Sequence, residues 1–180
     1  MAQQTKNPFV LFLEQMSERW LTHDEILDQY IAGLDDLDVA LDGLAGQDLD
    51  VARPDKWSIR QIVHHIVDGD DVWATCLKAA IGNPGCTFPM DWYHYQEWAQ
   101  VMDFGGRTIE PALALLRANR HFVAELVRHF PVAWEHSMRI TRPEIPDGYE
   151  QTVGRIIFIQ ACHVPWHIEQ IQATRELYEV

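Results

Sequence analysis

The chain has 180 residues, and its 47% hydrophobic content is enough to fill one continuous core, so we predict a single domain over residues 1–180. The formal net charge of -13 would repel nucleic-acid phosphates and anionic membrane surfaces, which argues against both as partners. The three cysteines lack C-x-x-C spacing, and the sequence has no apolar run of membrane-spanning length and no signal-peptide core. We therefore expect a cytoplasmic protein.

Helix start signals open the N-terminal part of the chain. Asn7 before Pro8 predicts a short extra helix over residues 8–20, because asparagine caps helices and proline fits their first turn. Thr22 and Glu25 have the spacing of a capping box, and apolar residues at helical spacing follow them. We predict the first long helix over residues 22–44.

A second capping box, Ser58 with Gln61, predicts a second long helix over residues 58–80. Residues 82–106 are interrupted by glycines and prolines and are rich in aromatic side chains. We predict a long aromatic loop with one helical turn there, placed to line a cavity.

Two more helices are predicted over residues 108–130 and 152–178, with a proline-rich connection at 142–148. No strand pattern recurs along the chain. The expected fold class is therefore all-α, a four-helix bundle in which sites are built from side chains on facing helices.

Helical position selects three of the nine histidines. His163 and His167 project toward the apolar side of the last helix at i and i+4, the spacing at which two imidazoles can share one metal. On the second long helix, His65 lies at the edge of the inward arc, whereas His64 lies about 100° further round and is expected to face solvent. The alternative is that each inward histidine only donates a hydrogen bond to a carbonyl or carboxylate. The presence of a third inward histidine on another helix argues against this alternative.

Two segments resemble the DinB/YfiT-like family of four-helix bundles, often labelled metal-dependent hydrolases. Residues 57–68, WSIRQIVHHIVD, resemble that family's W-S-x-R-E/Q-x-x-x-H-x-x-D block, and residues 162–171, CHVPWHIEQI, resemble its H-x-x-x-H-x-x-Q-I block. The resemblance implies a DinB-like bundle with metal ligands at His65, His163 and His167. It carries less information about the reaction, because such bundles include hydrolases, thiol-dependent transferases and isomerases.

The last helix departs from the family pattern at two positions. Pro165, between the two histidines, removes one helix hydrogen bond and is expected to kink the helix, which would shift the ligand geometry. Glu169 stands where the family often has a small residue, and we expect it on the outer face, away from the histidines.

Three neutral imidazoles leave coordination positions of a metal open, which is typical of a catalytic site. We expect one divalent ion, with zinc or nickel preferred and iron as an alternative. Asp68, one turn after His65, is a candidate catalytic residue that could orient a ligand or help deprotonate water; a solvated surface aspartate is the competing interpretation.

The leading functional hypothesis is a metal-dependent hydrolase acting on a small-molecule substrate. The alternatives are a metal-dependent thiol S-transferase that uses a low-molecular-weight thiol, and a non-catalytic metal-binding scaffold associated with stress. We expect a homodimer, because symmetric dimers are the commonest oligomers.

Overall fold

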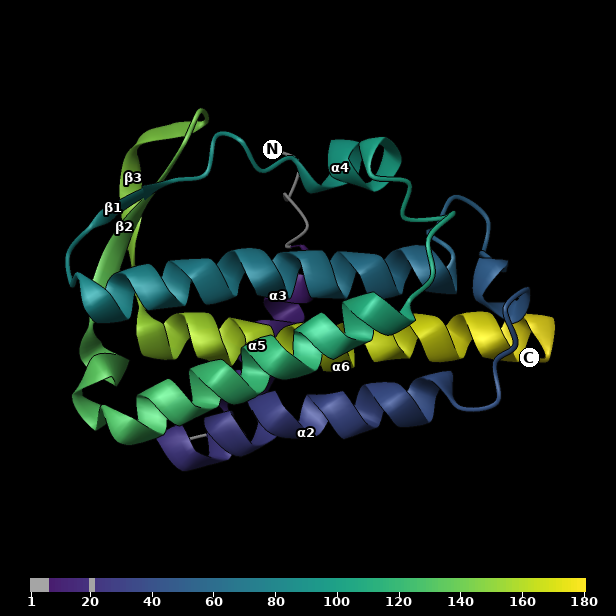
Figure 1. Ribbon diagram of the computed structural model, residues 1–180, viewed down its shortest axis with the longest axis horizontal. Coiled ribbons are helices and arrows are strands. Elements are labelled where there is room, and N and C mark those ends of the chain that lie inside the picture. Colours follow the sequence, from purple (N-terminus) through teal and green to yellow (C-terminus); the bar gives the residue numbers. More distant parts are fainter. Residues whose placement is uncertain (1–6, 20–21) are drawn as a thin grey trace, which may run out of the picture.

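Four long helices lie side by side along the length of the protein (Figure 1). The computed structural model describes residues 7–19 and 22–180. The long helices are α2 (His23–Leu41), α3 (Ile59–Gly82), α5 (Glu110–His129) and α6 (Val153–Tyr178). Helix α6 packs against α2 and α3, and α5 packs against the same two helices, so the four enclose one apolar interior. The predicted bundle is confirmed.

The helices begin where their caps require. The Thr22 hydroxyl accepts a hydrogen bond from the Glu25 backbone N–H, while the Glu25 carboxylate accepts one from the Thr22 N–H. Ser58 and Gln61 exchange the same pair of bonds at the start of α3. Both predicted capping boxes are therefore present, and their bonds satisfy backbone donors that a helix start would otherwise leave open.

Shorter elements surround the bundle. Helix α1 (Pro8–Ser17) packs on α6, and α4 (Tyr95–Val101) packs on α3. Single 3-10 turns occupy Asp48–Asp50 (η1) and Pro131–Glu135 (η2). The predicted end of the first helix at residue 20 lies outside the described residues. In the segment predicted as an aromatic loop, the structure has strand β1 (Thr87–Pro89) followed by α4.

A small sheet at one end of the bundle corrects the all-α prediction (Figure 1). Strand β2 (Ser137–Arg142) pairs in parallel with β1 and antiparallel with β3 (Ile145–Thr152). The residues that alternate inward on β2 are Met138 and Ile140, both fully buried. This two-residue period was present in the sequence but is only two apolar residues long, which is too short to predict a strand, and part of the pairing comes from the distant β1.

The interior contains one buried ion pair besides its apolar side chains. Arg120 is fully buried, and its Nε donates to the Asp70 carboxylate over 2.9 Å. The other two guanidinium nitrogens donate to the backbone carbonyls of Tyr30 and Gln160, so a single side chain ties α2, α3 and α6 to α5.

Among the described helices, none has the length and apolarity needed to cross a membrane.

Candidate metal centre

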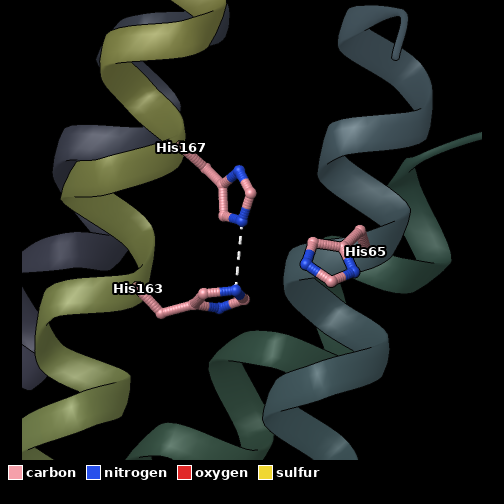
Figure 2. Close-up of side chains that lie close together, drawn as sticks. All are labelled: His65, His163 and His167. Atoms are coloured by element: carbon pink, nitrogen blue, oxygen red, sulfur yellow. Dashed lines mark hydrogen bonds between the residues drawn. The ribbon is translucent and has the colours of Figure 1, made fainter. Parts of the chain in front are cut away.

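The three histidines selected from the sequence meet between α3 and α6 (Figure 2). His163 and His167 project from one face of α6, and their Nε2 atoms lie 3.1 Å apart. His65 approaches from α3, and one ring nitrogen of each histidine lies within 4.8 Å of the other two. The three ring centroids are separated by 4.6 to 5.2 Å, with the rings nearly perpendicular to one another.

The local geometry of α6 brings the pair together. Residues four positions apart lie one above the other on a helix, so both rings extend in the same direction. Val164 and Ile168, the residues that follow each histidine, are buried and hold this side of α6 against the bundle. Helix α6 continues through Pro165 to Tyr178. Glu169 is exposed, as expected from the sequence.

Burial keeps all three imidazoles neutral. Burial lowers the pKa of His65 to about 3, with repulsion from His167 adding to the effect. Burial lowers the pKa of His167 to about 4, and the pKa of His163 is also well below its ordinary value, first through burial and then through its histidine neighbours. A neutral imidazole is the form that ligates a metal.

The hydrogen bonding of the cluster fits a metal ion. Only one proton can lie between the two Nε2 atoms of His163 and His167, and the Nδ1 atoms of all three histidines are buried without a partner within the described part of the chain. A metal ion in place of that shared proton would let both Nε2 atoms bind through their lone pairs. With metal–nitrogen bonds of about 2.0–2.1 Å, neighbouring ligand atoms lie about 3.0–3.4 Å apart. The observed 3.1 Å between the two Nε2 atoms meets this requirement.

A cavity of about 540 Å³ opens onto the three histidines. On the α3 side, the rings of Trp57 and Tyr95 lie 4.7 and 5.3 Å from the His65 ring. On the α6 side, Phe9 lies 5.9 Å from the His163 ring and packs against Trp166. The cavity is therefore walled by aromatic rings from four parts of the chain, with the imidazoles at its base.

The prediction that His64 faces solvent is wrong. His64 is only 4% exposed, because the segment after α4 covers this face of α3. Its ring lies 5.6 Å from the fully buried Phe104 and contacts the side chain and carbonyl of Arg107 at 3.2 and 3.4 Å. His64 is nevertheless on a different face of α3 from His65 and takes no part in the cluster.

Asp68 lies behind the histidine cluster and does not line the histidine cavity. It borders a second cavity of about 530 Å³ together with His64 and Arg107. Burial raises the pKa of Asp68, and a hydrogen bond from Tyr93 opposes that rise. The Tyr93 hydroxyl lies beside Gly69, where a methyl group would stand 3.7 Å from it and 3.6 Å from His163 Cε1. The catalytic role of Asp68 stays a prediction.

Other residues of the block at 57–68 support the local structure. Arg60 donates to the Asp50 carboxylate and to the carbonyls of Gly46 and Arg107, which fastens the preceding loop to α3. The capping residues and this arginine orient the helix, whereas Trp57 and His65 reach the cavity.

Several cavity residues were missed at the level of sequence. They are Phe9, Arg53, Lys56, Trp57 and Trp166. Trp57 and Trp166 stand in the two family blocks, whereas the others come from segments whose place around α3 and α6 is decided by packing. Tyr95, which also lines the cavity, belongs to the aromatic segment that was predicted to line one.

Residues 29–171 match the family described as the DinB superfamily. The chain belongs to the DinB superfamily. The histidine cluster of this chain is divided between two helices, with His65 on α3 and with His163 and His167 on α6.

Three relatives of this DinB chain carry related names. It is 27% identical to a protein of Oceanobacillus iheyensis over 152 residues, covering 81% of this chain and 84% of that one. It is 30% identical to a protein of Geobacillus kaustophilus over 142 residues, covering 78% and 77%. Both are named "putative metal-dependent hydrolase". The solved structure of YfiT from Bacillus subtilis, described as "a probable metal-dependent hydrolase with an unusual four-helix bundle topology", matches with a TM-score of 0.76, 18% identity and 87% coverage of each chain.

Proposed function

We propose that this DinB protein is a metal-dependent hydrolase that acts on a small molecule through one divalent ion held by His65, His163 and His167. The observation that carries the proposal is the convergence of three neutral imidazoles, one buried and two partly buried, on one cavity. The names of the two relatives from Oceanobacillus iheyensis and Geobacillus kaustophilus support the same reaction class. Zinc or nickel is the proposed metal, with iron as the alternative, since imidazole suits all three.

A divalent ion bound by three neutral imidazoles keeps its charge and open coordination positions, and it can polarise a carbonyl or make water more acidic. The protein's own groups hold and shape the site. Trp57 and Tyr95 on one side, with Phe9 and Trp166 on the other, limit water around the histidines and offer contact surface to an apolar substrate. Asp68 accepts a hydrogen bond from the Tyr93 hydroxyl, and both that hydroxyl and His163 Cε1 lie beside Gly69.

The alternative thiol transfer would need an external thiol. Cys76 and Cys162 are buried, and burial raises the pKa of each to about 12, so neither forms a thiolate near neutrality. Cys86 is partly exposed, and none of the three cysteines lines the histidine cavity. The proposed small-molecule substrate and homodimer stay predictions.

Metal analysis of protein purified without chelators or nickel resin tests the ligand set. Wild type should carry about one divalent ion per chain, and His65→Ala, His163→Ala and His167→Ala should each lose it. His64→Gln is the matched control, because it alters the adjacent histidine of the same helix and should retain the metal. Retention of a full complement by His65→Ala, or its loss in His64→Gln, would refute the assignment.

A substrate screen separates the reactions. Esters and amides are offered to the metal-loaded protein with and without glutathione. Thiol-independent turnover that disappears in His163→Ala supports the hydrolase. Turnover that strictly requires glutathione would overturn it in favour of thiol transfer, and no turnover in either screen would favour the non-catalytic scaffold.

A further inference from the structure

Arg53 is a charged side chain that lines the histidine cavity and has no partner among the described residues. Its Nε is buried and makes no hydrogen bond to any described residue. Within residues 7–19 and 22–180, no carboxylate lies within 4.0 Å of Arg53 or of Lys56, the second cation of the cavity wall. Both side chains lie in the segment that leads into α3, and both border the same cavity as His65 and His167.

The position of Arg53 distinguishes it from the other arginines. The chain has 27 acidic and 14 basic residues, so carboxylates are abundant. Arg60, Arg117 and Arg120 pair with Asp50, Asp38 and Asp70, whereas Arg107, Arg139 and Arg155 pair with no carboxylate among the described residues. Arg53 is the arginine that lines the histidine cavity. The Arg53 side chain is partly buried and lines the cavity, and it makes no hydrogen bond to any described residue. Its guanidinium is therefore free to donate to an acceptor that enters the cavity.

The charges around the cavity favour an anion. Its wall carries the cations Arg53 and Lys56 and a single carboxylate, Asp55, which pairs with neither of them within the described residues. The formal side-chain charge of the wall is thus positive in a chain whose net charge is -13. A guanidinium binds a carboxylate through two parallel hydrogen bonds, which gives orientation as well as affinity.

We propose that Arg53 is the specificity residue of this site and binds a carboxylate of the substrate. Lys56 adds a second positive charge, the rings of Trp57, Tyr95 and Trp166 contact the apolar part of the molecule, and its hydrolysable bond lies at the histidines. The substrate class is a small carboxylic acid with an apolar or aromatic portion and an ester or amide bond. The assignment of that bond rests on the proposed function, whereas the binding of the carboxylate rests on Arg53 alone.

Calorimetric titration of the zinc-loaded full chain tests the inference with two probes of the same shape. N-acetylphenylalanine carries a carboxylate, and N-acetylphenylalanine amide is its neutral counterpart. Wild type should bind the acid about tenfold or more tightly than the amide, which corresponds to about 1.4 kcal/mol. Arg53→Gln should remove this preference by weakening the acid alone, and Arg53→Lys should restore part of it. Arg128→Gln removes the same charge from the exposed surface of α5 and should change nothing.

Each result bears on Arg53 separately from the metal. Equal affinities of wild type for acid and amide, equal weakening by Arg53→Gln and Arg128→Gln, or no binding of the acid at millimolar concentration would overturn the inference. If one of these results is obtained while Arg53→Gln still binds one metal ion per chain, the inference about Arg53 fails and the proposed function stands. If wild type holds no metal, the proposed function fails, yet an Arg53-dependent preference for the acid still supports the anion site.

Discussion

Replacing His167 by glutamine should make the metal-free protein less sensitive to acid. His167 is 7% exposed, and burial lowers its pKa to about 4. In the unfolded chain the same imidazole has its ordinary pKa of about 6.5. Below that pH the unfolded state therefore binds more protons than the folded state, so the free energy of unfolding decreases as the pH falls from about 6.5 toward 4.

The size of the effect follows from the two pKa values. A pH of about 5 lies about 1.5 units below the pKa of the unfolded chain, and each unit changes the free energy of unfolding by about 1.36 kcal/mol. His167 alone should therefore lower the free energy of unfolding by about 2 kcal/mol at this pH. Burial shifts the pKa of His65 in the same direction, and the loss from that residue adds to this one. The raised pKa values of Asp68 and Asp70 act in the opposite direction, since their folded forms take up protons more readily.

Urea unfolding of chelator-treated protein at about pH 7 and about pH 5 measures the difference. Between these two pH values, His167→Gln should lose about 2 kcal/mol less stability than wild type. Because only the change with pH is compared, a uniform loss of stability in the variant cancels. His121→Gln, which removes an exposed imidazole from α5, is the control and should follow wild type. If His167→Gln loses as much stability as wild type on acidification, the burial argument is refuted.

Three further substitutions test other parts of the structure. Arg120→Met should destabilise the protein by about 3–5 kcal/mol in urea unfolding, because it leaves Asp70 buried without its counter-charge; a loss below about 1 kcal/mol would contradict this. Gly148→Ala should lower the melting temperature, because Gly148 has a φ of 68° and an added Cβ would lie 2.6 Å from the Ile140 carbonyl oxygen. An unchanged melting temperature would contradict this geometry of the β2–β3 hairpin. Asp68→Asn should reduce turnover while the metal content stays at that of wild type, and unchanged kinetics would exclude the predicted role.

Local rules accounted for the long helices and for the three histidines of the candidate site. Thr22 with Glu25 and Ser58 with Gln61 place helix starts because a cap acts over three residues, well within reach of one turn. His163 and His167 share a face for the same reason, since helical geometry fixes positions four apart whatever surrounds them.

Tertiary packing decided which faces are covered and which distant segments meet. His64 and His65 have similar sequence surroundings, yet Phe104 and Arg107 bury one and the cavity receives the other. Strand β2 pairs with the adjacent β3 and also with β1, about fifty positions earlier in the chain, and Arg53 lines the histidine cavity although it precedes α3. Periodicity shows which side of an element is apolar, but burial and pairing depend on the neighbour that covers it, and that neighbour comes from elsewhere in the chain.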